Sequence, residues 1–445
     1  MRTFIYAVIA IVWGLGMTTG SAEAQQKWVV SWAASVQGPY PTGNPSAQPD
    51  QRFAFPVPPD GANDQSFRLI VRPTIWSRQA RLRFSNAFGT KPVTFDGVFV
   101  GLQLGGAALL KGTNRPVTFG AKASVTIPPG GMVWSDPVNL GIRDPEAPEL
   151  MGRKLAVSFH VADTSGPMTW HAKALQTSYV TPPKAGAKGN DEGEAAFPYP
   201  TASWFFLDAV EMRMGPASFA VVGFGDSITD GTLSTMNGDD RWPDVLARRL
   251  YAVHGNRIAV VNAGIGGNQI AGPPEYGPAK PYPGGPSAKM RMDRDVLGLS
   301  GVAALIWLEG INDFSKNGVQ DADKVITTLQ EVVGHIRGKR PDIRLIAATV
   351  TSALGATNAN HGFVEQDERR KTLNLFLRTG KLFDNVVDFD AVLLDPATGG
   401  IKGEFVPDST AGGPGDKLHP NRVGYLAMGM AVDLAVMKGK PALGR

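Results

Sequence analysis

From about residue 214 to the end of the chain, apolar runs alternate with segments of helical periodicity, and this alternation constrains the fold most strongly. Apolar runs without internal polar alternation are typical of parallel strands that are buried on both faces. We expect strands at five such runs, 219–224, 258–265, 302–313, 344–350 and 386–393. We expect helices at 241–253, 321–338, 365–380 and 421–438. The pattern predicts an α/β domain over residues 214–445, with a five-stranded parallel sheet between helices.

Residues 25–213 follow a different pattern, in which short alternating segments are separated by Gly, Pro, Asn and Asp. In the segment QARLRFSNAF, for example, Ala80, Leu82 and Phe84 fall on one face of a strand. No convincing amphipathic helix interrupts this region. It is predicted to be an all-β domain, either a sandwich or a jelly roll.

The first 24 residues combine a basic start, a short apolar stretch and the small-residue sequence Ala22-Glu23-Ala24. This is the pattern of a signal peptide, and the apolar stretch is too short for a membrane span. We expect cleavage after Ala24 and a secreted or periplasmic protein without stable membrane insertion. The chain has no cysteine, which excludes disulfides, cysteine nucleophiles and thiolate metal sites. A net charge of +4, with Lys and Arg scattered along the chain, argues against nucleic-acid binding.

Polar or glycine-rich sequence follows three of the predicted strands. Ser227 comes after the first, the turn NAGIGGN with Gly267 after the second, and GIND with Asn312 at the end of the third. The segment GPGDKLHPN places Asp416 and His419 just before the last predicted helix. Because parallel strands end at one edge of a sheet, we expect these residues to converge there.

The residue types at this edge suit acyl transfer. A serine hydroxyl needs a base, an imidazole near neutral pH is such a base, and a carboxylate holds the imidazole in one tautomer. Backbone N–H groups of a glycine-rich turn and the amide of Asn312 can stabilise a developing oxyanion. Each segment alone also fits an ordinary turn or helix cap. The four together, in this order, favour a serine hydrolase.

These four segments resemble the sequence blocks of the GDSL, or SGNH, hydrolase family of esterases and lipases. GDSITDG matches the first block, with Ile228 where the family name has Leu; NAGIGGN, GIND and DKLH match the others. The resemblance implies a flavodoxin-like α/β/α domain with Ser227 as nucleophile, and with His419 and Asp416 completing a triad. It also implies an oxyanion hole formed by the N–H groups of Ser227 and Gly267 and by the Asn312 side chain. The region from KWVVSWAAS onward resembles the extra domain of two-domain secreted bacterial members.

The natural substrate is open at this stage. O-deacetylation of a carbohydrate is the first hypothesis, a short-chain or aryl ester the second and a lysophospholipid the third. The rival class is a glycan-binding protein with a degenerate hydrolase domain. An ordinary α/β-hydrolase is disfavoured because GDSIT lacks the second glycine of G-x-S-x-G.

No cofactor and no metal site are predicted, and the sequence does not indicate an oligomeric state. Four histidines are assigned to packing or to the surface, namely His160, His171, His254 and His335, and His361 receives no catalytic role. Tyr276 and Tyr282, in a proline-rich loop, are candidates for a wall of the substrate site.

Overall fold

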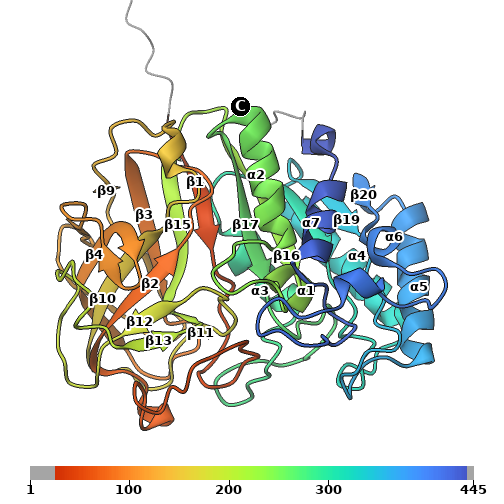
Figure 1. Cartoon of the computed structure of the whole chain (residues 1–445), viewed down its shortest axis with the longest axis horizontal. Coiled ribbons are helices and arrows are strands. Elements are labelled where there is room, and N and C mark those ends of the chain that lie inside the picture. The colour runs from red at the N-terminus through yellow and green to blue at the C-terminus, as the bar shows by residue number, and fades with distance from the viewer. Residues whose placement is uncertain (1–25, 438–445) are drawn as a thin grey trace, which may run out of the picture.

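The computed structural model describes residues 26–437 and contains an all-β region followed by an α/β region. Figure 1 shows the β region, in red to yellow-green, beside the α/β region, in green to blue. The predicted signal peptide, residues 1–24, lies outside the described residues.

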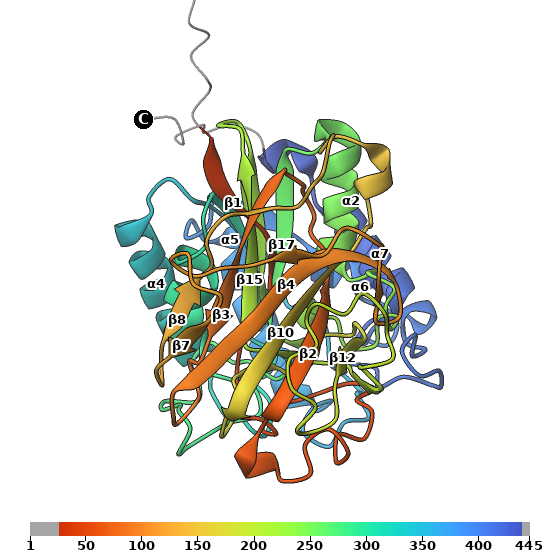
Figure 2. The same ribbon diagram turned by 90° about the vertical axis from the view of Figure 1, so that its left-hand side faces the viewer.

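The β region contains two main antiparallel sheets. The first has the order β1-β15-β3-β8, with β9 beside β3; its strands are β1 (Lys27–Ala33), β15 (Leu207–Met214), β3 (Gln79–Ser85), β8 (Met132–Trp134) and β9 (Val138–Asn139). The second has the order β13-β12-β2-β10-β4-β5, with β6 and β7 beside β4; its strands are β13 (Tyr199–Thr201), β12 (Ser178–Val180), β2 (Asn63–Val71), β10 (Leu155–Thr164), β4 (Val93–Gly105), β5 (Ala108–Leu109), β6 (Arg115–Pro116) and β7 (Val125–Ile127). A two-stranded ribbon joins β11 (Trp170–His171) and β14 (Trp204–Phe205). Figure 2 shows β2, β10 and β4 side by side.

Aromatic side chains fill the space between the two sheets. The ring of Phe84 on β3 lies 5.2 Å from that of Phe159 on β10, in an edge-to-face arrangement. Ala80, Leu82 and Phe84 are all fully buried, as the alternation predicts. The other face of β3 is also covered, because Arg83 forms a buried ion pair with Asp208, with a nitrogen–oxygen distance of 2.6 Å.

The α/β region has a five-stranded parallel sheet in the order β17-β16-β18-β19-β20. Its strands are β16 (Phe219–Gly225), β17 (Ile258–Gly264), β18 (Val302–Leu308), β19 (Arg344–Ala348) and β20 (Asn385–Val387). The helices are α1 (Ser227–Asp230), α2 (Trp242–His254), α3 (Ala288–Met292), α4 (Ala322–Lys339), α5 (Val364–Thr379), α6 (Phe389–Leu393) and α7 (Arg422–Ala431). Neighbouring residues of one strand belong to different cores: Val221 packs with α2 and α7, and Val222 packs with α4 and α5. Both faces of the sheet are therefore buried, as continuous apolar strands require.

Two of the predicted strands are much shorter than expected. The prediction for 386–393 was wrong beyond β20, because the Asp388 carboxylate accepts a hydrogen bond from Ala391 N and caps helix α6. The strand predicted over 302–313 ends at Leu308. Gly310 then takes a φ of +136°, which turns the chain out of the sheet.

The β region covers the free edge of the parallel sheet at β17. The hydroxyl of Thr74 accepts a hydrogen bond from Val260 N at 3.1 Å, and β1 packs against β17. An edge strand covered in this way cannot pair with another chain. No helix among residues 26–437 is both long enough and apolar enough to span a bilayer.

Candidate active site

Ser227 is the first residue of α1 and follows directly on strand β16. The carboxylate of Asp226 accepts a hydrogen bond from Ile228 N at 2.9 Å and so caps this short helix. The sharp change from strand to helix holds the Ser227 hydroxyl at the carboxyl edge of the sheet. The residue is only 6% exposed.

His419 and Asp416 lie directly beside Ser227. Nε2 of His419 is 2.7 Å from Oγ of Ser227, and Nδ1 of His419 is 2.6 Å from Oδ2 of Asp416. Oδ1 of Asp416 accepts the backbone N–H groups of Leu418 and His419. Burial works to raise the pKa of Asp416, but the hydrogen bonds from His419 and from these N–H groups hold that pKa well below its usual range. The carboxylate is therefore ionised at neutral pH and orients the ring.

Gly267 and Asn312 lie in two loops that meet at the same edge of the sheet. Nδ2 of Asn312 donates to the carbonyl of Asn268, the residue after Gly267, at 3.0 Å. Oδ2 and Oδ1 of Asp313 accept the N–H groups of Ile270 and Ala271, both at 2.8 Å. These bonds fix the glycine-rich loop to the end of β18.

The glycine-rich loop also packs against helix α1, which begins at Ser227. A Cβ placed on Gly264 would lie 2.2 Å from Asp230 N, so only glycine allows this close approach. Within residues 26–437, the N–H groups of Ser227 and Gly267 have no hydrogen-bond acceptor. Free N–H groups beside a nucleophile can bind an oxyanion.

Arg291 is a fully buried residue close to the site. Its guanidinium donates to the carbonyl of Gly225, the last residue of β16, to that of Ala263, the next-to-last residue of β17, and to Oδ1 of Asn268. It also lies 3.7 Å from the ring centre of Phe224. Arg291 therefore joins the ends of β16 and β17 to the glycine-rich loop. No motif marks it in the sequence.

Comparison with known families adds an independent observation. Residues 224–427 match the family described as GDSL-like Lipase/Acylhydrolase. The chain contains a GDSL-like lipase/acylhydrolase domain. It is a carboxylic ester hydrolase, and Ser227, His419 and Asp416 all fall within the matched GDSL-like domain.

Several solved structures resemble about half of the chain. They include a carbohydrate acetylesterase from Sinorhizobium meliloti (14% identity, TM-score 0.36, 50% of this chain and 100% of that one). A lipase/acylhydrolase from Enterococcus faecalis has 22% identity and a TM-score of 0.36, over 49% of this chain and 94% of that one. The aryl esterase of M. smegmatis has 15% identity and a TM-score of 0.35, over 48% and 96%. No curated protein matches the chain.

The β region contributes side chains to the GDSL-like domain beside Ser227. Nε2 of His171 lies 3.1 Å from Oδ1 of Asp230, and Nζ of Lys173 donates to Oγ1 of Thr232 at 2.5 Å. Burial lowers the pKa of Lys173. The sequence predicts a packing or surface position for His171 and gives no indication of a role for Lys173. Contacts between residues about 60 positions apart leave no local signal.

His361 and the two tyrosines lie in loops around the site. Burial, and to a smaller extent the charge of His419, lowers the pKa of His361 to about 4. Nε2 of Gln366 donates a hydrogen bond to Nδ1 of His361 at 2.7 Å. The hydroxyl of Tyr276 donates to the carbonyl of Gly38, which lies in the β region. Whether these tyrosines line the substrate site stays a prediction.

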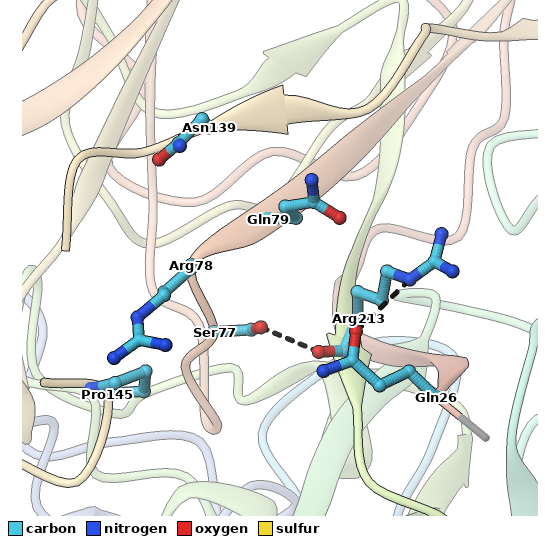
Figure 3. Close-up of a pocket in the computed structure, with 7 residues that line it drawn as sticks. All are labelled: Gln26, Ser77, Arg78, Gln79, Asn139, Pro145 and Arg213. Atoms are coloured by element: carbon cyan, nitrogen blue, oxygen red, sulfur yellow. Dashed lines mark hydrogen bonds between the residues drawn. The ribbon is translucent and has the colours of Figure 1, made fainter. Parts of the chain in front are cut away.

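A polar pocket in the β region, lined in part by Ser77, Arg78 and Arg213, is separate from this site (Figure 3). None of the predicted site residues lines it, and the Ser77 hydroxyl donates to the carbonyl of Arg213 at 2.6 Å. Across residues 26–437, no group of three or more His, Asp and Glu side chains is arranged to hold a metal ion.

Three buried carboxyl groups, those of Asp226, Glu309 and Asp313, lie in the GDSL-like domain near Ser227. Burial raises the pKa of Asp226 to about 7 and that of Asp313 to about 7. Burial also raises the pKa of Glu309 well above its usual range, and neither of its carboxyl oxygens has a hydrogen-bond partner among residues 26–437. The nearest cation is Arg291, at 3.9 Å from Glu309.

We predict that the contribution of these carboxyl groups to the stability of the protein falls as the pH rises toward 7. A folded-state pKa near 7 lies above the ordinary value of 3.8, so the folded state binds more protons than the unfolded state. Asp226 and Asp313 each lower the free energy of unfolding by about 1.4 kcal/mol per pH unit between about pH 5 and 6, and by less as the pH nears 7. Asp226→Asn keeps the helix cap and should make this slope shallower, as measured by urea unfolding at several pH values. The exposed cap variant Asp321→Asn is the control, and an unchanged slope in Asp226→Asn would contradict the prediction.

Proposed function

We propose that this protein is a serine esterase that hydrolyses carboxylic esters through an acyl-enzyme. The observation that carries the proposal is the position of His419, whose two ring nitrogens lie 2.7 Å from Ser227 Oγ and 2.6 Å from Asp416 Oδ2. A base in contact with both a nucleophile and an orienting carboxylate can take the hydroxyl proton as the nucleophile attacks.

In the proposed reaction, Oγ of Ser227 attacks the ester carbonyl carbon and its proton moves to Nε2 of His419. The oxyanion is stabilised by the N–H groups of Ser227 and Gly267 and by Nδ2 of Asn312. The C–O bond to the alcohol then breaks, and His419 gives the leaving oxygen its proton. Water attacks the acyl-enzyme with His419 again as base, which releases the acid and restores the Ser227 hydroxyl.

We propose the O-acetyl group of a carbohydrate as the substrate. The enclosure of the site supports a small acyl group, because Ser227, Asn312 and His419 are each less than 10% exposed. The adjacent β region supplies a surface on which a larger alcohol part, such as a glycan, can lie. A short-chain or aryl ester and a lysophospholipid are the alternatives.

Release of acetate from acetylated xylan or pectin tests this substrate class. We expect acetate release from the polymer, together with hydrolysis of nitrophenyl esters that falls steeply as the acyl chain grows beyond acetyl. Activity that rises toward long acyl chains would favour the lipid alternative. Efficient hydrolysis of nitrophenyl acetate without any release from the polymers would favour a short-chain or aryl ester.

Replacing Asn312 by alanine is expected to lower kcat about 10²- to 10³-fold, because the variant loses one donor to the oxyanion. Steady-state hydrolysis of nitrophenyl acetate measures the effect. Asn317→Ala, an exposed residue in the same loop, is the matched control and should keep wild-type kcat. A loss below tenfold in folded Asn312→Ala would remove this side chain from the oxyanion hole.

Two further proposals concern architecture and location. We propose a flavodoxin-like α/β/α arrangement for the GDSL-like domain. The sheet order β17-β16-β18-β19-β20 supports it, because it is 2-1-3-4-5 when the five strands are numbered along the chain. We also propose export from the cytoplasm to the periplasm or the medium, which is supported by the signal-peptide pattern of residues 1–24.

A further inference from the structure

The peptide group between Gly266 and Gly267 lies at the centre of a tight turn. Asn268 N donates to the carbonyl of Ile265 at 3.1 Å, which closes a four-residue turn over residues 265–268. Gly267 has a φ of +84°, the value expected at the third position of a type II turn. A type I turn closes the same four residues with the central peptide rotated by about 180°. Two consecutive glycines make both turns sterically accessible.

The orientation of this peptide decides whether the Gly267 N–H is available to an oxyanion. A trans peptide is planar, so the carbonyl of Gly266 and the N–H of Gly267 point in opposite directions. In the type II turn this N–H has no acceptor among residues 26–437. In the rotated turn, the carbonyl oxygen of Gly266 would take its place and would repel an oxyanion.

A side chain from the β region holds the carbonyl end of this peptide. Nδ2 of Asn44 donates to the carbonyl of Gly266 at 2.7 Å. On the other side of Gly266, its own N–H donates to Oδ2 of Asp230 at 2.9 Å. The bond to Asp230 holds only the Ile265–Gly266 peptide, to which the Gly266 N–H belongs. The bond from Asn44 can form only when the Gly266–Gly267 peptide has the orientation of the type II turn.

The segment that carries Asn44 is itself fixed in place. The indole of Trp170 donates to the carbonyl of Thr42 at 3.1 Å, and Nε2 of Gln37 donates to the carbonyl of Pro283 at 3.0 Å. A Cβ on Gly43 would lie 2.6 Å from Gln37 Nε2 and 2.7 Å from Ala172 Cβ, so the chain packs closely here. The Asn44 amide therefore approaches the glycine turn from a rigid support.

We propose that Asn44 is a positioning residue for the oxyanion hole, which it completes by holding the Gly266–Gly267 peptide with the Gly267 N–H toward the substrate. This inference rests on the proposed esterase function. It gives the β region a direct part in the reaction, because a side chain about 220 residues before the glycine turn selects the conformation of that turn. Removal of the Asn44 amide lets the rotated, inactive turn become populated.

The test replaces Asn44 by Asp, which has the same shape but offers no donor to the carbonyl, and separately by Ala. For hydrolysis of nitrophenyl acetate we expect kcat to fall about 10- to 100-fold, with KM within threefold of the wild-type value. Inhibition by a boronic acid, which forms a tetrahedral adduct on serine, should weaken by a similar factor. Gln48→Ala is the matched control, because Gln48 bonds to Thr201 and Ala202 within the β region and should leave kcat unchanged.

Each variant is measured at a temperature where circular dichroism shows it folded. A kcat within threefold of the wild-type value in both Asn44 variants would overturn the inference, as would a change confined to KM. Ser227→Ala, measured alongside, separates this from failure of the esterase proposal. If Ser227→Ala is inactive while the Asn44 variants are fully active, the esterase stands and the role of Asn44 falls; if Ser227→Ala keeps its activity, the esterase proposal itself fails.

Discussion

Replacing Ser227 by alanine is expected to lower kcat for ester hydrolysis by about 10⁴- to 10⁶-fold, the largest effect predicted for a single substitution in this protein. The hydroxyl is the atom that bonds to the acyl carbon, so neither His419 nor the oxyanion donors can replace it. The fold should be preserved, because the change removes one oxygen and leaves the Asp226 cap of α1 intact. Steady-state kinetics and thermal unfolding measure the two quantities.

Two controls accompany this variant. Ser234→Ala removes a buried serine hydroxyl from the loop after α1 and should keep wild-type kcat. A fluorophosphonate probe should label the wild-type protein at Ser227 and leave Ser227→Ala unlabelled, since only an activated serine reacts. Near-normal hydrolysis by Ser227→Ala would refute the assignment, and a wild-type protein that is neither labelled nor active would favour a glycan-binding role instead.

The side chains proposed to be catalytic could be located from the sequence because their geometry follows from local rules. Ser227 comes at the end of a continuous apolar strand, and parallel strands end at one edge of the sheet. Asp416 and His419 are three residues apart, a separation that a single turn can close, and their side chains do meet at 2.6 Å. The roles of these residues stay predictions until they are measured.

The residues that support the site could not be located in this way. Arg291 bonds to the carbonyls at the ends of β16 and β17, and Asn44 bonds to a carbonyl 222 positions away. These carbonyl groups belong to the backbone, which is present in every residue and gives no sequence signal. The same limit affected strand 386–393, where the Asp388 cap competes with an apolar pattern that favours a strand.

Replacing Asp416 by asparagine is expected to lower kcat about 10⁴-fold with little change in stability. The oxygen of the new amide can still accept the N–H groups of Leu418 and His419, so the turn is kept. Its NH₂ group, however, faces Nδ1 of His419 and donates to it. The ring proton then moves to Nε2, and a protonated Nε2 cannot accept the proton of Ser227.

The pH profile separates this effect from general damage to the site. Hydrogen bonds hold the pKa of Asp416 well below its usual range, so this carboxylate stays ionised and adds no step to the wild-type profile between pH 5 and 9. Asp416→Asn should regain rate at high pH, where hydroxide can assist in place of the misoriented imidazole. Asp395→Asn is the matched control, because Asp395 also accepts a backbone N–H two residues ahead but bonds to no histidine in the described part of the chain. A loss of less than tenfold in folded Asp416→Asn would show that the orientation of His419 does not depend on this carboxylate.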